Sequence, residues 1–295
     1  MPYIKVGKEN SGDIELYYED HGTGRPVILI HGWPLSLDSW EKQVPVLLEA
    51  GYRVIAYDRR GFGRSGRPSS GYTYDTFAED LNKIMTKLDL KEASLVGFSM
   101  GGGEVARYMG TFGSGRVRNV TFISAVPPFL LKTDDNPAGV DGIVFDGIRK
   151  AIVEDRPKFL MQFFYDFYNV DVMKKDRISD EAIRFSWTIG AGASAKATLD
   201  CVSAWTTDFR DDVSSIKVPS LIVHGDADRI VPFPSSGKRT HNLIDGSRLV
   251  VLKDAPHGLN WTHAAELNHA LLDFLAIEPS VQKHGNARAP MKAKH

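Results

Sequence analysis

The stretch from Ala93 to Met109 limits what this chain can fold into more than any other. Its first residues, 93–96, form a short apolar run that is typical of a buried strand. Its last residues, 104–109, have apolar side chains at helical spacing and predict a helix. Between them Ser99 has a glycine two residues away on either side, at Gly97 and Gly101. A strand, a sharp turn and a helix in this order are the context that a G-x-S-x-G nucleophile elbow requires. Glycines let the strand and the helix approach closely, and the turn would lift the serine hydroxyl clear of a sheet.

The same alternation of strand and helix continues through most of the chain. Continuous apolar runs predict buried strands, residues 14–20 predict a half-exposed strand near a sheet edge, and longer periodic patterns predict helices. The predicted strands are 14–20, 26–30, 53–57, 93–96, 120–125, 219–225 and 248–252, and the predicted helices include 39–50, 73–88, 236–243 and 263–276. Strands that alternate with helices indicate an α/β fold, with a mostly parallel sheet and helices on both of its faces.

Residues 127–216 break this rhythm, because they contain no strand-like run. Helical patterns occupy 142–154, 157–168, 180–190 and 195–206 instead. We predict that 127–216 form a helical cap at the carboxyl ends of the strands, and that 1–126 and 217–279 form one discontinuous core domain. Aromatic residues crowd the 157–168 pattern; most should pack in a core, and some should line a pocket. Residues 280–295 have no apolar periodicity and are predicted to be a disordered tail.

The composition argues against several classes of partner. A formal net charge of −1 gives no electrostatic case for nucleic acid or for an anionic membrane. No segment offers the ~20 apolar residues that would span a bilayer, and the first residues lack the features of a signal peptide, so we expect a cytoplasmic protein. The single cysteine, Cys201, rules out an internal disulfide. No ligand pattern for a metal or a haem is visible, so we expect neither a metal nor a cofactor.

A serine hydroxyl becomes a useful nucleophile only when an imidazole takes its proton and a buried carboxylate orients that imidazole. For a nucleophile on such an elbow, the chain order is serine, then acid, then histidine. His257 fits, because it lies between a proline and a glycine directly after a predicted strand. Asp226 and Asp228, in the loop after the preceding strand, remain rivals for the acid. Of the other histidines, His31 is predicted to shape its loop and His224 to be a satisfied core residue.

Motifs along the chain resemble those of the α/β-hydrolase superfamily, and more closely those of its cofactor-free haloperoxidase (perhydrolase) and aryl esterase branch. The resemblance covers about residues 3–275. It rests on GFSMG at 97–101, HGWP at 31–34, DRRGFGRS at 58–65, HGDADRIVP at 224–232 and APHG at 255–258. It implies an α/β-hydrolase fold, with a mostly parallel eight-stranded sheet and the helical cap inserted after the sixth strand.

The resemblance also implies roles for individual residues. In that branch the acid is the second aspartate of the His-Gly-Asp-x-Asp loop, so the implied catalytic residues are Ser99, Asp228 and His257. The implied donors of an oxyanion hole are the backbone N–H groups of Trp33 and Met100. The implied lining of the substrate pocket includes Trp33, Val126 and Ile230. Relatives are often homo-oligomers, so a homo-oligomer is expected here too.

We therefore interpret the chain as a serine-dependent hydrolase that cleaves small carboxylic esters through an acyl-enzyme, with perhydrolysis as a side activity. Lactone or amide (lactam) hydrolysis would use the same residues, and a small-molecule receptor with an idle triad is the alternative outside enzymes. Dehalogenase and epoxide hydrolase chemistry would want an aspartate where Ser99 stands. Pro34 follows Trp33, as in members better known for perhydrolysis. Our hypothesis is that proline restricts Trp33 and aims its carbonyl group at an attacking peroxide.

Overall fold

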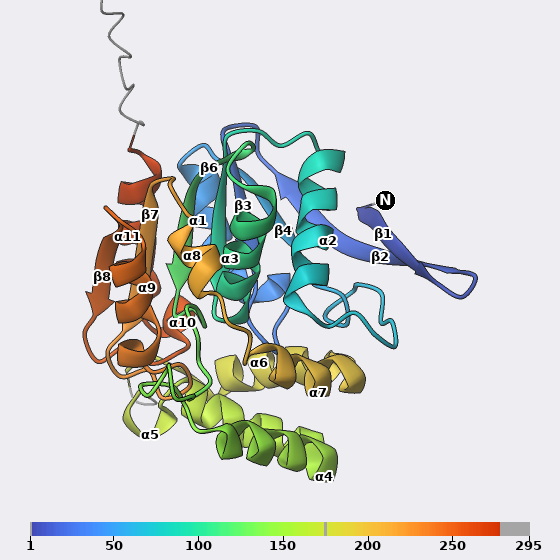
Figure 1. Cartoon of the computed structure of the whole chain (residues 1–295), viewed down its shortest axis with the longest axis vertical. Coiled ribbons are helices and arrows are strands. Elements are labelled where there is room, and N and C mark those ends of the chain that lie inside the picture. The colour runs from blue at the N-terminus through green and yellow to red at the C-terminus, as the bar shows by residue number, and fades with distance from the viewer. Residues whose placement is uncertain (1, 174–175, 278–295) are drawn as a thin grey trace, which may run out of the picture.

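Eight strands form a single sheet in a computed structural model that describes residues 2–173 and 176–277 (Figure 1). The strands are β1 (Tyr3–Glu9), β2 (Gly12–His21), β3 (Pro26–Ile30), β4 (Arg53–Tyr57), β5 (Ala93–Phe98), β6 (Val117–Ile123), β7 (Ser220–Gly225) and β8 (Arg248–Leu252). Their order across the sheet is β1-β2-β4-β3-β5-β6-β7-β8. The six strands from β4 to β8 in this order run parallel, and β1 and β2 extend the edge in antiparallel pairs. This confirms the predicted mostly parallel eight-stranded sheet.

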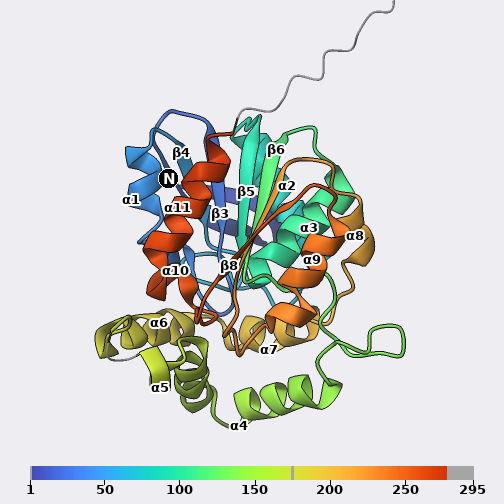
Figure 2. The same ribbon diagram turned by 90° about the vertical axis from the view of Figure 1, so that its left-hand side faces the viewer.

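Helices cover both faces of this sheet, as Figures 1 and 2 show together. On one face lie α1 (Val44–Glu49) and α11 (Ala264–Leu275), preceded by α10 (Leu259–Thr262). On the other lie α2 (Tyr74–Lys87), α3 (Met100–Phe112), α8 (Arg210–Ser214) and α9 (Gly237–Leu243). Because both faces are covered, every residue of β5 and all but the first of β3 are buried, which accounts for their unbroken apolar runs.

The register of the central strands brings their following loops together. Ile30, the last residue of β3, pairs with Gly97 of β5, and Phe98 pairs with Ile123, the last residue of β6. The loops that follow these strands therefore leave the sheet at one edge. That edge is the carboxyl end of a parallel sheet, where ligands bind in open α/β folds.

Four further helices lie beyond this edge, in the segment between β6 and β7: α4 (Gly142–Phe167), α5 (Val170–Met173), α6 (Asp180–Gly192) and α7 (Ala195–Ala204). Figure 2 shows them as a layer across the end of the sheet. The helical segment thus enters after the sixth strand, as expected. Its boundaries as a domain, 127–216, stay predictions, and the predicted tail at 280–295 lies outside the described residues.

A kink divides α4 near its middle, where the sequence predicts two separate helices. Asp155 has non-helical backbone angles (φ −157°, ψ 86°), and Pro157 follows inside the second half. Proline cannot donate a backbone hydrogen bond and its ring crowds the preceding turn, so the first half ends before it. The Asp155 carboxylate then accepts from the N–H of Lys158 at 3.0 Å and caps the second half.

The predicted helix over 39–50 is wrong in its bounds. The structure has a short 3₁₀ helix, η1 (Leu37–Trp40), and then α1, which begins only at Val44. Ser36 accepts from the N–H of Asp38 and starts η1, whereas Pro45 stands in the first turn of α1. Among the described residues, no helix is both long and apolar enough to cross a bilayer.

Candidate active site

Ser99 lies in the tight turn that joins β5 to α3. Its backbone is in a strained region, with φ +53° and ψ −118°, and the residue is buried. A Cβ atom on Gly97 would lie 2.5 Å from the carbonyl oxygen of Gly101, and one on Gly101 would lie 2.2 Å from that of Ile30. The two glycines are therefore required by the close approach of strand and helix, and the turn has the geometry that the G-x-S-x-G pattern predicts.

His257, in the loop after β8, contacts Ser99 at the carboxyl edge of the sheet. Its Nε2 lies 2.8 Å from Oγ of Ser99, and its Nδ1 lies 2.7 Å from Oδ2 of Asp228. A carboxylate only accepts, so Nδ1 carries the proton and Nε2 accepts from the serine hydroxyl. The rings of Phe98 and Phe167 lie 5.2 and 5.0 Å from the imidazole, centroid to centroid. They surround this chain of hydrogen bonds with apolar side chains.

The Asp228 carboxylate is buried, and both of its oxygens have hydrogen-bond partners. Oδ1 accepts from the N–H groups of Ile230 (2.9 Å) and Val231 (2.8 Å), while Oδ2 faces His257. Burial alone would raise the pKa of this carboxyl. The charge of His257 and the hydrogen bonds from His224 and His257 outweigh burial and hold the pKa well below its ordinary value. Asp228 is therefore ionised in the pH range in which a histidine can act as a base.

Asp226, the rival acid, has a different position. It is exposed, and its Oδ1 accepts from the backbone N–H of Asp254 at 2.6 Å. That bond ties the loop after β7 to the loop after β8, the kind of turn-stabilising role that a short acidic side chain takes. The structure thus brings Asp228, and not Asp226, to His257.

His224, the penultimate residue of β7, is buried as predicted, but the prediction of a satisfied core histidine did not include its contact with Asp228. Its Nε2 lies 2.9 Å from the carbonyl oxygen of Val231 and 3.3 Å from Oδ2 of Asp228. The imidazole therefore contacts the same carboxylate oxygen as His257. The signal available in the sequence was its place four residues before Asp228, across a tight strand-end turn.

His31 shapes the loop after β3, as predicted. Its Nδ1 donates to the carbonyl oxygen of Gly32 at 2.8 Å, and its Nε2 accepts from the N–H of Arg59 at 3.0 Å. Burial, aided by the nearby charge of Arg59, lowers the pKa of His31 well below its ordinary value, so the ring stays neutral. A Cβ on Gly32 would come within 3.0 Å of Cβ of Ser99, which shows how closely this loop lies against the serine.

A buried ion pair links this loop to the helix that follows the elbow. Nε of Arg59 lies 2.7 Å from Oε2 of Glu104 on α3, while Nη2 of Arg59 donates to the carbonyl oxygen of His31 at 2.9 Å. The other oxygen of Glu104 accepts from the hydroxyl of Tyr57. Neither Arg59 nor Glu104 is more than 1% exposed, so breaking the pair would leave an uncompensated buried charge. Sequence reasoning did not find this pair.

The two predicted oxyanion donors are adjacent to Ser99. Met100 is the first residue of α3, and the first N–H groups of a helix have no partner within it. Trp33 follows Gly32 in the loop that lies against the serine. The oxyanion would form on the carbonyl oxygen of a substrate, and the role of these two backbone N–H groups as its donors stays a prediction.

Ser99 opens into a small cavity of about 260 Å³ between the sheet and the cap helices. The predicted lining residues Trp33, Val126 and Ile230 all face it. Most other lining residues are apolar, and three are polar: Gln162, Asp166 and Arg229. Phe159 and Phe163 come from the aromatic 157–168 segment, some of whose rings were expected to line a pocket. The sequence did not predict the remaining apolar lining residues, which are Leu130, Val140, Val144, Phe145, Ile148, Trp205 and Val231. Both halves of the kinked α4 therefore contribute to one wall.

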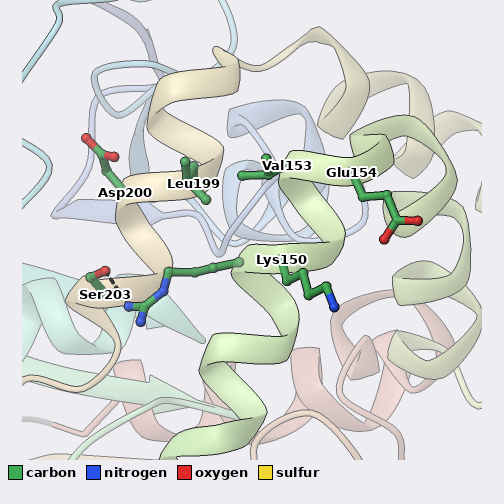
Figure 3. A pocket seen from close by; sticks show the side chains of 7 residues that line it. Lys150, Val153, Glu154, Leu199, Asp200 and Ser203 are labelled. Atoms are coloured by element: carbon green, nitrogen blue, oxygen red, sulfur yellow. Dashed lines mark hydrogen bonds between the residues drawn. The ribbon is translucent and has the colours of Figure 1, made fainter.

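A larger depression of about 840 Å³ lies elsewhere, between α4 and α7 (Figure 3). Val153 and Leu199 line its apolar part, and Arg149 at its side donates to the hydroxyl of Ser203 at 3.0 Å. No hydroxyl–imidazole pair lies among its lining residues, so the smaller cavity, at Ser99, is the candidate active site. Over residues 2–173 and 176–277, no group of three His, Cys, Asp or Glu side chains is placed to hold a metal ion.

Comparison with known proteins gives matches over most of the chain. Residues 25–264 match a family model described as the alpha/beta hydrolase fold. A Synechocystis sp. protein named "Putative non-heme chloroperoxidase" is 62% identical over 93% of this chain and 100% of its own length. A bifunctional esterase/perhydrolase from Acinetobacter calcoaceticus is 37% identical over 89% of this chain and 96% of its own. The crystal structure of a bromoperoxidase from Bacillus anthracis superimposes with a TM-score of 0.89, at 52% identity over 92% of this chain and 98% of that one.

Proposed function

Because this chain belongs to the alpha/beta hydrolase fold family, we propose that it is a serine hydrolase that cleaves small carboxylic esters through an acyl-enzyme. The observation that carries the proposal is the hydrogen-bonded chain from Ser99 through His257 to Asp228, with Ser99 on the wall of an apolar cavity. Esterases and perhydrolases among its relatives support the reaction class.

In the proposed reaction, Oγ of Ser99 attacks the carbonyl carbon of the ester while Nε2 of His257 takes the hydroxyl proton. The N–H groups of Trp33 and Met100 stabilise the oxyanion, and each such donor typically contributes ~3 kcal/mol. Asp228 stays ionised because its pKa is held low, and it stabilises the imidazolium. His257 then returns the proton to the leaving alcohol, which leaves the acyl group on Ser99.

Deacylation repeats these steps with a second nucleophile. His257 takes a proton from water, the hydroxide attacks the acyl carbonyl, and Ser99 leaves with the proton as the carboxylic acid is released. Hydrogen peroxide in place of water would give a peracid and the same free enzyme. Relatives named as haloperoxidases and as an esterase/perhydrolase favour this side activity. We propose that halogenation, where it occurs, proceeds through that peracid.

The cavity supports small substrates with an apolar acyl group. Its volume of about 260 Å³ is below the range of about 300–1,000 Å³ that is usual for drug-sized ligands. Trp33 and Trp205 both line it, and their rings meet edge to face at 4.8 Å between centroids. Lactone or amide hydrolysis on the same residues, and a receptor with an idle triad, stay open as alternatives.

The experiment that tests the proposal measures hydrolysis of p-nitrophenyl esters from acetate to octanoate by the wild type and by Ser99→Ala. We expect turnover on the short esters and a loss of roughly a thousandfold or more in the variant. Repeating each assay with hydrogen peroxide and a peracid-sensitive dye tests perhydrolysis. Folded wild-type protein that turns over no ester would refute the esterase assignment and favour a receptor or a narrower lactone or amide substrate.

A further inference from the structure

A second histidine contacts the carboxylate of the proposed triad. Oδ2 of Asp228 lies 2.7 Å from Nδ1 of His257 and 3.3 Å from Nε2 of His224, and all three side chains are at most 1% exposed. The triad as usually described needs only one of these imidazoles. The position of His224 is therefore not explained by the reaction steps above.

The protonation of the His224 ring follows from its neighbours. Nε2 faces two acceptors, the carbonyl oxygen of Val231 and Oδ2 of Asp228, and neither can donate. Nε2 must therefore carry the proton. It is shared unequally, since the contact with Val231 is 0.4 Å shorter (3.3 minus 2.9). The other ring nitrogen, Nδ1, lies against the backbone of Gly237, where a Cβ atom would come within 2.6 Å of it.

Val231 forms hydrogen bonds with both His224 and Asp228. Its carbonyl oxygen accepts from His224, and its N–H donates to Oδ1 of Asp228 at 2.8 Å. His224 thus binds the carbonyl group of the residue whose N–H binds Oδ1 of Asp228, and its ring directly faces Oδ2. Removing its N–H would free the loop after β7 and leave His257 as the sole side-chain donor to Oδ2 among the described residues.

We propose that His224 is a positioning residue of this site, one that fixes the Asp228 carboxylate through Val231 and shares its Oδ2 with His257. The proposal rests on the esterase function proposed above. A carboxylate oxygen that accepts a second hydrogen bond is a weaker acceptor for the first. His224 therefore moderates how strongly Asp228 favours the imidazolium form of His257, and it keeps His257 available as a base at lower pH.

In the described part of the chain, no titratable side chain other than Asp228 contacts the imidazole rings of His224 and His257. The ring centroid of Phe233 lies 5.6 Å from that of His224, and the neighbouring strand β8 places Val251 opposite His224. His257 is flanked by two phenylalanine rings. Asp228 is the charged side chain that both imidazoles contact.

The test compares three substitutions in the full-length enzyme. His224→Gln keeps an amide N–H that can reach the same acceptors, His224→Asn carries one that is too short, and His224→Leu has none. With p-nitrophenyl acetate, we expect Leu and Asn to lower kcat by about tenfold or more with little change in KM. The acid limb of their kcat/KM profile should move to higher pH by about half a unit, and Gln should restore both quantities. Folded Leu and Asn variants with the wild-type kcat and acid limb would overturn the proposal, as would a Gln variant no better than Leu.

A second measurement depends neither on turnover nor on any variant. The ¹⁵N–¹H correlation spectrum of histidine-labelled wild-type protein reports which nitrogen of each ring carries the proton. We expect a His224 ring with its proton on Nε2; a ring protonated on Nδ1 alone refutes the proposal. Absence of ester turnover by the wild type would count against the esterase function instead, and the spectrum would still decide the role of His224.

Discussion

The residues that line the cavity allow a quantitative prediction of how kcat/KM depends on the length of the acyl chain. Phe163, on the second half of α4, lines the cavity and meets Trp33 edge to face, with 5.1 Å between ring centroids. Replacing Phe163 with Ala removes a whole ring from between α4 and Trp33. Longer acyl chains should then enter the space that the ring occupied.

The size of the effect follows from the area that becomes buried. Each buried methylene is worth about 0.8 kcal/mol, so two further methylenes give about 1.6 kcal/mol, or roughly fifteenfold in kcat/KM. We expect p-nitrophenyl octanoate to gain about that factor in Phe163→Ala, while acetate, whose acyl group is too short to fill the new space, should change little. A Phe→Ala change in a core costs about 3–5 kcal/mol of stability, and a residue that borders a cavity should fall at the low end.

The assay measures kcat/KM for the ester series from acetate to octanoate, on protein whose folding is checked by its thermal transition. Phe164→Ala is the matched control, because Phe164 neighbours Phe163 on the same helix but packs in the core against Phe167 and Tyr168. The control should lower all esters by a similar factor. A folded Phe163→Ala enzyme with the wild-type chain-length profile, or with the profile of the control, would refute this account of the pocket.

Three further predictions concern the loop after β3, a buried carboxyl and the elbow. Pro34→Leu should lower the ratio of perhydrolysis to hydrolysis, measured with a peracid dye and by ester cleavage; an unchanged ratio would contradict the role given to Pro34. Burial, opposed by N–H groups of Arg64 and Leu37, raises the pKa of Asp58 to about 6. The folded protein therefore binds this proton more tightly than the unfolded chain, and stability should fall by up to about 3 kcal/mol as pH rises from about 4 to 6. Between pH 4 and 6, urea unfolding should show that the wild type loses more stability than Asp58→Asn by about this amount; an equal loss in both would contradict it. Gly101→Ala should lose about 1–3 kcal/mol or more because its Cβ would overlap the carbonyl of Ile30, whereas Gly147→Ala, with open space around it, should be neutral or slightly stabilising in the same unfolding assay.

The sequence predicted the central part of the sheet because burial there is uniform. Strands covered on both faces, such as β3 and β5, leave continuous apolar runs that no exposed residue interrupts. The edge strand β1 was missed, since only Ile4 and Val6 of its seven residues are buried and three of the others, Lys5, Lys8 and Glu9, are charged. The short helices α5 and α8 were missed as well, because four or five residues are too few to show a helical period.

For the candidate site, the order of residues along the chain helped to predict the three proposed catalytic residues, but contacts between residues far apart in the sequence could not be predicted. Ser99, Asp228 and His257 each follow a strand of a parallel sheet, so their convergence at one edge could be expected from chain order alone. The pair of Arg59 and Glu104 is separated by 45 residues and joins a loop to a helix, which leaves no local pattern in the sequence. The contact between His224 and Asp228 depends on how tightly the loop after β7 turns back, and a strand pattern does not report that.

The chain leaves the sheet after β6, forms α4 to α7, and returns to it at β7. Much of the wall that faces a substrate therefore comes from one uninterrupted stretch, while the serine, histidine and aspartate come from loops outside it. The residues that would contact the substrate and the residues that would react with it are therefore encoded largely in separate parts of the gene. Under the proposed function, mutation or recombination confined to that stretch would alter which acyl groups are accepted, while Ser99, His257 and Asp228 are inherited unchanged.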